Sequence, residues 1–155
     1  MSEPPCAPKT RFLIPELEMY LVDVLPGFSC KRCAECCTGK LIPLYESDMD
    51  RMKPHVRARF FRKTKGLERL ITGARYKMLM VEGRCIFLEG GSCKNYDLRP
   101  NTCRRHPFLA TEKHYLVSST CPGVDWNSSQ RAEECRRLSK DISRAIDSFL
   151  NKECL

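Results

Sequence analysis

The chain has 155 residues, the size of one ordinary domain, and its hydrophobic content of 42% allows only a modest core. Lysine and arginine exceed aspartate and glutamate by 27 to 19, a formal net charge of +8, but each metal site with four thiolates would subtract about two units, so the charge alone does not indicate nucleic-acid binding. The sequence has neither a secretory apolar region nor an apolar run near the ~18 residues that span a bilayer, so we expect a cytoplasmic protein.

Cysteine is unusually frequent in this chain. Its 11 occurrences are about 7% of the residues, whereas Phe, Tyr and Trp together reach only 8%. In a reducing cytoplasm thiols stay reduced, so this many cysteines indicates bound metal in preference to disulfides. The odd number agrees, because intramolecular pairing could not include every cysteine.

The first part of the chain predicts an irregular segment followed by helix. Residues 1–29 contain five prolines, and the mixed spacing of the apolar stretch 17–25 fits a short strand or a packed arm. We expect an irregular N-terminal arm. Ser47 and Asp48 offer an N-cap, and apolar residues recur beyond it as far as residue 61. This pattern predicts one or two helices near residues 47–65.

Short strands and cysteine-bearing loops are expected in the middle of the chain. Residues 66–75 are basic and turn-rich, and residues 76–88, with Glu-Gly at their centre, predict a hairpin. Residues 89–107 combine glycines, prolines and cysteines, which favours a looped metal-binding segment. Residues 114–118 predict a further strand.

The C-terminal part predicts a helix that closes the fold. Asn127 and Gln130 form a capping-box-like start, and apolar residues then recur at helical spacing from Ala132 to Phe149. The expected fold class is α+β, a small metal-stabilised domain with several helices, a short β-hairpin and cysteine-rich loops. Within this single domain we expect an arm at 1–29, a metal-binding core at 30–126 and a packed helix at 127–155.

The strongest local signal is the array from Cys30 to Cys37, which reads C-x-x-C-x-x-C-C. Two thiolates two residues apart can bind one metal, because the loop between them turns back and offers its amides to the sulfurs. Adjacent Cys36 and Cys37 cannot easily reach one ion from a relaxed backbone, so the doublet indicates a multinuclear cluster or two neighbouring sites. The spacing also mirrors three ligands of a bacterial ferredoxin run, whose remote fourth cysteine precedes proline, as Cys121 does here.

Later cysteines complete a larger set, since Cys85, Cys93, Cys103 and Cys121 raise the number of thiolates to eight, enough for two tetrahedral sites. Together with the neighbouring motifs Cys85-Ile-Phe-Leu88, Cys93-Lys-Asn-Tyr96, Arg99-Pro100, Cys103-Arg104 and Pro107-Phe108, the array resembles the CxxCxxCC family, also called YkgJ-type zinc- or iron-chelating domains. The resemblance spans about residues 30 to 121. It implies a centre of zinc, of an iron–sulfur cluster such as 4Fe-4S, or of both. The eight ligand positions carried over are Cys30, Cys33, Cys36, Cys37, Cys85, Cys93, Cys103 and Cys121.

Other residues near the cysteines have both functional and plainer interpretations. Arg99, Arg104 and Arg105 lie among the cysteine loops, where guanidinium groups can donate hydrogen bonds to ligand sulfurs and offset negative charge. His106 could bind metal, but a surface or hydrogen-bonding role is favoured because the cysteines suffice. Cys135 falls on the apolar side of the last helix and is expected to be a core thiol.

Three functions are consistent with these residues. The leading hypothesis is a cytoplasmic metal-binding protein that supplies structural order or electrons as an accessory of a larger complex. The second is a zinc-stabilised adaptor whose basic run at residues 57–65, interleaved with Phe60 and Phe61, contacts RNA or a ribonucleoprotein. The third is an iron-dependent protein-modifying enzyme with an open coordination position. The family's larger relatives resemble flagellin lysine methylases, but this chain has no evident S-adenosylmethionine-binding segment.

Overall fold

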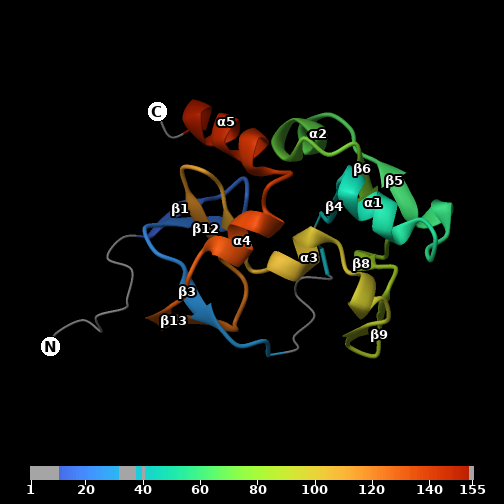
Figure 1. The fold of residues 1–155 in the computed structure, drawn as a ribbon, viewed down its shortest axis with the longest axis horizontal. Coiled ribbons are helices and arrows are strands. Elements are labelled where there is room, and N and C mark those ends of the chain that lie inside the picture. Colours follow the sequence, from blue (N-terminus) through green and yellow to red (C-terminus); the bar gives the residue numbers. More distant parts are fainter. Residues whose placement is uncertain (1–10, 32–37, 40, 154–155) are drawn as a thin grey trace, which may run out of the picture.

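A four-stranded antiparallel sheet joins the N-terminal strands to residues far along the chain (Figure 1). In this computed structural model, which describes residues 11–31, 38–39 and 41–153, the strands run in the order β1, β2, β12, β11. Their bounds are Arg11–Ile14 for β1, Met19–Val22 for β2, Phe108–Ala110 for β11 and Tyr115–Ser118 for β12.

The central strand β12 is covered on both faces. Leu116 packs with Ile142 and Ile146 of the C-terminal part, whereas the neighbouring Val117 packs with Phe108 and Cys135 on the other side. Successive side chains of a strand point to opposite faces, so the two packed layers follow directly from the sequence order of β12. Leu116 and Val117 are both fully buried.

The prediction of an irregular N-terminal arm is wrong for residues 11–28. Strands β1 and β2 form a hairpin whose turn places Glu18 in the left-handed region, at a φ of 53°. β2 then pairs with β12, with Leu21 opposite Leu116, and β3 (Pro26–Phe28) pairs with β13 (Val124–Ser129). Residues 11–28 form strands because β2 and β3 pair with strands about 95 residues away. The mixed spacing of residues 17–25 carries no information about such distant partners.

A second, smaller sheet lies in the other half of the molecule (Figure 1). Its strand order is β4, β6, β5, and its core contains Leu44, Met78 and, from helix α1, Met49 and Met52. The elements of this half are β4 (Pro43–Leu44), α1 (Glu46–Met52), η2 (Ala58–Phe60), β5 (Phe61–Lys63), α2 (Leu67–Thr72) and β6 (Tyr76–Met78).

The predicted helical region is therefore only partly correct. A helix does begin near the expected N-cap, but it ends at Met52, and residues 58–63 form a 3-10 turn followed by a strand. Phe61 pairs with Met78 in the small sheet, so its apolar spacing reflects strand packing. The segment 66–75, expected to be turns, contains α2, which ends at Gly73 in the left-handed conformation that glycine accommodates.

The cysteine-rich segment contains two miniature hairpins and a short helix. The predicted hairpin at 76–88 is confirmed for its central part, where Met80 faces Cys85, whereas residues 76–78 pair with β4 and β5. The segment 89–107, expected to be looped, holds a second hairpin and α3, which contacts both α4 and β4. The elements are β7 (Met80–Val81), β8 (Arg84–Cys85), β9 (Leu88–Glu89), β10 (Ser92–Cys93), η3 (Tyr96–Leu98) and α3 (Asn101–Arg105).

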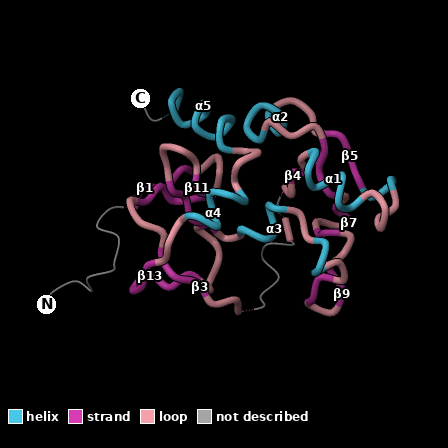
Figure 2. Tube along the Cα trace, viewed as in Figure 1, coloured by secondary structure: helices cyan, strands magenta, loops and turns pink. Residues whose placement is uncertain are grey.

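The C-terminal helix begins later than predicted and is divided in two. Of the two residues that resembled a capping box, Asn127 belongs to β13 and Gln130 directly follows it, and helices α4 (Glu133–Leu138) and α5 (Ser143–Glu153) come after them (Figure 2). Between the helices the fully buried Ser139 accepts a hydrogen bond from the amide of Ala110 through its Oγ, at 3.1 Å. This contact anchors the break against β11, which sequence periodicity could not indicate.

Helices and short antiparallel strands alternate along the chain, so the predicted α+β class is confirmed. Within the described residues no helix has both the length and the apolar composition needed to cross a membrane. The predicted division at residues 29 and 126 stays a prediction.

Candidate metal centre

A cavity of about 610 Å³ brings together cysteines from four separate segments. The four are Cys30, which follows β3, Cys85 at the end of β8, Cys93 at the end of β10, and Cys103 on α3. All four belong to the predicted ligand set. Apolar side chains such as Met78, Phe87 and Leu88 complete much of the wall, so the sulfur-bearing residues are set in a largely apolar surrounding.

Two tight turns position Cys85 and Cys93. In the first hairpin Glu82 and Gly83 have φ values of 52° and 76°, and in the second Gly90 and Gly91 have values of 59° and 79°. Two consecutive left-handed residues define the turn that matches the twist of a two-residue hairpin. Each turn returns the chain at once, so that each of these two cysteines ends the second strand of a hairpin.

A buried carboxylate positions Cys103. Asp48 is completely buried, and its Oδ1 accepts a hydrogen bond of 2.9 Å from the amide of Asn101, the first residue of α3. The same carboxylate accepts hydrogen bonds from the amide of Tyr45 at 3.0 Å and from Arg51 at 2.9 Å. Asp48 was expected only as a candidate cap of its own helix; the link to α3, 53 residues away, depends on the tertiary fold.

Both ends of the cysteine array lie close to this cavity. Cys30, the first residue of the array, lines the cavity. Thr38, which directly follows the array, forms an isolated bridge with Arg84, next to Cys85. The amide of Gly39 also donates a hydrogen bond of 2.6 Å to the carbonyl of Gly83. The remaining cysteines of the array, Cys33, Cys36 and Cys37, lie outside the described residues.

Cys121 precedes β13 and Cys30 follows β3, two strands that pair with each other. β13 pairs with β3 so that Val124 faces Phe28, and the amide of Ser29 donates a hydrogen bond of 2.9 Å to the carbonyl of Gly123. This hydrogen bond lies one residue before Cys30 and two residues after Cys121. A Cβ on Gly123 would lie only 2.4 Å from the carbonyl oxygen of Ser29, so this close approach of two backbone segments requires glycine.

The described part of the chain does not by itself form a complete metal site. Within residues 11–31, 38–39 and 41–153, no three His, Cys, Asp or Glu side chains are grouped as metal binding requires. Thiolates are nevertheless the donors that zinc and iron–sulfur clusters select, so the residues present fit such a group chemically. A complete ligand set requires further cysteines.

Asn95 and Arg99 contribute polar groups to the cysteine cavity. Asn95 Nδ2 is buried, and among the described residues it has no hydrogen-bond acceptor. Arg99 lies over the ring of Tyr96, 3.7 Å from its centroid, and its Nε donates to the carbonyl of Tyr96 at 3.0 Å. An amide donor that lacks an acceptor beside several cysteines is what a sulfur-ligated metal would use, and sequence reasoning did not identify Asn95.

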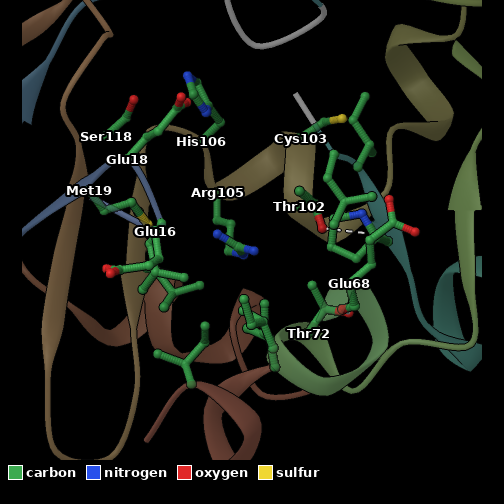
Figure 3. Close-up of a pocket in the computed structure, with 18 of the residues that line it drawn as sticks. Glu16, Glu18, Met19, Glu68, Thr72, Thr102, Cys103, Arg105, His106 and Ser118 are labelled. Carbon is green, nitrogen blue, oxygen red and sulfur yellow. Dashed lines mark hydrogen bonds between the residues drawn. The ribbon is translucent and has the colours of Figure 1, made fainter. Parts of the chain in front are cut away.

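The other two predicted arginines do not line this cavity in the described structure. Arg104 is exposed on α3, and Arg105 points into a different cavity, whose wall also includes His106 (Figure 3). Cys135 is buried as predicted, and burial raises the pKa of its thiol. The expectation that Arg104 and Arg105 assist the ligand sulfurs stays untested.

One comparison with known proteins, the family match, indicates metal chelation. Residues 29–122 match a family described as "CxxCxxCC: Putative zinc- or iron-chelating domain". "Uncharacterized protein MJ0661" of Methanocaldococcus jannaschii is 26% identical over 107 residues, which are 68% of this chain and 57% of that protein. The match therefore spans little more than half the length of this relative. No solved structure matches the chain.

Proposed function

The chain belongs to the CxxCxxCC family of zinc- or iron-chelating domains, and we propose that its eight family-type cysteines hold one thiolate-bound metal centre. The ligands proposed are Cys30, Cys33, Cys36, Cys37, Cys85, Cys93, Cys103 and Cys121. The observation that carries this proposal is the shared cavity of Cys30, Cys85, Cys93 and Cys103. These residues lie up to 73 positions apart in the chain, and local sequence alone would not bring them together.

The weakness of the cysteine hairpins supports a structural role for the metal. Strands β7 to β10 are each two residues long, and most residues at their turns are exposed. An isolated hairpin of this size is at best marginally stable in water. Structural zinc binding contributes about 10 kcal/mol or more, so sulfur–metal bonds would stabilise a segment that buries little apolar surface.

An iron–sulfur cluster would add electron transfer to this structural role. The adjacent cysteines at positions 36 and 37 favour a multinuclear group over a single ion, and Asn95 would donate a hydrogen bond to a ligand sulfur. Such a cluster takes up and releases single electrons. We therefore propose an accessory or electron-transfer role for the cluster form in a larger protein complex, and a purely structural role for the zinc form.

The metal is tested by elemental analysis and absorption of anaerobically purified protein. A band near ~400 nm that dithionite bleaches identifies a cluster, whereas colourless protein with about two zinc ions identifies the structural form. Cys93→Ser is expected to lower the metal content, while Cys135→Ala, which removes a buried thiol outside the proposed set, retains it. Unchanged metal content in Cys93→Ser, or metal-free wild-type protein that folds normally, contradicts the proposal.

The exposed cations near η2 support the adaptor as a second candidate. Arg57, Arg59, Arg62, Lys63 and Lys65 are all exposed. Phe60, however, packs edge-on against Phe87 with ring centroids 5.5 Å apart, so it belongs to the core contacts of this half. RNA binding through this surface would depend mainly on phosphate contacts, and its affinity would fall steeply with salt. RNA affinity that is absent at low salt removes this candidate.

A further inference from the structure

A second cavity, of about 450 Å³, lies on the other side of Cys103 and Ile42, which line both cavities. Its wall is mostly apolar and includes Leu109 from the large sheet and Ile146 from α5. Its volume falls within the range of about 300–1,000 Å³ found for small-molecule sites. The cavity is separate from the proposed metal ligands except at Cys103.

The guanidinium group of Arg105 projects into this cavity (Figure 3). The Nη1 atom donates a hydrogen bond of 3.1 Å to the carbonyl of Phe108, which fixes the side chain in place. A guanidinium carries five N–H donors, and the bond to Phe108 uses one of them. The other donors are available to a ligand in the cavity. The fixed head group is therefore positioned to bind an acceptor inside the cavity.

Arg105 has no carboxylate partner among the described residues. No ion pair among the described residues includes Arg105, and the carboxylate of the nearby Asp48 already accepts hydrogen bonds from Tyr45, Arg51 and Asn101. Arg105 is half-buried, and a guanidinium that lies against apolar walls without a carboxylate partner is suited to an anionic ligand.

We propose that this cavity binds a small monocarboxylic acid with an apolar body, whose carboxylate pairs with Arg105. The planar guanidinium matches a carboxylate through two parallel hydrogen bonds. The apolar body contacts the wall formed by Leu109, Ile142 and Ile146. This binding site goes beyond the proposed metal centre and does not depend on it.

The acidic residues around the cavity define which ligands it excludes. Glu68 already pairs with Lys77, with Nζ 2.8 Å from Oε2, and Glu16 and Glu18 are exposed at the rim. Solvent screens the charges of Glu16 and Glu18, so their repulsion of a single ligand carboxylate beside Arg105 is weak. A ligand with several negative charges would extend towards these glutamates and be repelled. The site therefore favours a monoanion.

An alternative role for Arg105 would be to balance the thiolate of Cys103. Two residues along an α-helix are separated by about 200° of rotation, so Cys103 and Arg105 project to nearly opposite sides of α3. Figure 3 shows the guanidinium directed away from the Cys103 sulfur. The orientation therefore favours a ligand in the second cavity over a direct contact with the metal centre.

Titration calorimetry with octanoate, octanamide and octylamine tests the proposal on the full chain. Octanoate is expected to bind at least tenfold more tightly than the uncharged octanamide, because it forms charge-assisted hydrogen bonds. Arg105→Gln is expected to remove this preference, whereas Arg104→Gln, an exposed arginine on the same helix, keeps it. Ile71→Phe narrows the cavity without touching Arg105 and is expected to weaken both ligands about tenfold.

Three results would overturn the inference. These are equal affinity of the wild-type protein for octanoate and octanamide, tighter binding of octylamine, and octanoate binding that is unchanged by Ile71→Phe. If circular dichroism shows that Arg105→Gln does not fold, the proposal is tested by the ligand comparison on the wild-type protein and by the Ile71→Phe variant. Metal content, measured on the same samples, reports separately on the proposed metal centre.

Discussion

Replacing Asp48 by alanine tests whether helices α1 and α3 are joined as the structure describes. The carboxylate is completely buried and accepts hydrogen bonds from two backbone amides, those of Tyr45 and Asn101, and from Arg51. Alanine removes all three acceptor contacts and adds no steric conflict. The substitution therefore leaves two amides at helix starts without their acceptor.

The expected loss can be estimated from these contacts. Each buried polar group left without a partner costs about 1–3 kcal/mol, and the side chain of Arg51, which is 37% exposed, can turn to water at little cost. Asp48→Ala should therefore lower the free energy of unfolding by about 3–5 kcal/mol. For a protein of this size the corresponding fall in Tm is roughly 10 °C.

Urea unfolding followed by circular dichroism measures this loss. Asp50→Ala is the matched control, because Asp50 lies on the same helix and is exposed, and its effect should stay within about 0.5 kcal/mol. Asp48→Ala should also bind metal more weakly than Asp50→Ala, since α3 carries Cys103. If Asp48→Ala unfolds within about 1 kcal/mol of the wild type, the buried network does not join the two helices.

Three further results are expected. Gly91→Ala should lower the free energy of unfolding in urea by about 1–2 kcal/mol. A Cβ at this position would meet no atom, so the loss comes from the φ of 79°, which alanine adopts only with strain, and an unchanged urea midpoint would rule out the tight turn. Asn95→Asp should reduce metal affinity about 10–100-fold in chelator competition, because it replaces a buried donor by a negative acceptor, and equal affinity would remove Asn95 from the site. The hydrogen bond from Lys77 lowers the pKa of Glu68 below its usual 4.5. The ion pair therefore stabilises the fold fully above pH 4.5, and this stabilisation is lost as the pH falls through the lowered pKa. The difference between wild type and Glu68→Gln in urea should therefore vanish in acid, and a difference that grows there would contradict the pairing.

The family and the ligand candidates could be predicted from the sequence because metal chelation depends on residue type and spacing. The cysteine array and the later cysteines can be recognised without coordinates, and the family match covers residues 29–122, which include all eight. The hairpin turn at Glu82–Gly83 was also predictable, since the signal lies in two adjacent residues. Local chemistry of this kind does not need the rest of the chain.

Long-range pairing decided the elements that sequence analysis misjudged. β2 became a strand because β12 lies beside it, and the helix expected to begin at residue 127 gave way to β13 because β3 pairs with it. Short segments of mixed spacing have weak intrinsic preferences, so the partner supplied by the fold determines their conformation.

What the sequence determined by itself is therefore the kind of chemistry, a set of thiolates suited to zinc or iron. Only the tertiary structure decided where those residues meet. It placed Cys30, Cys85, Cys93 and Cys103 around one cavity and directed Arg105 into another. The physical reason is that residue type fixes what a side chain can bind, whereas its neighbours in space depend on contacts between distant parts of the chain.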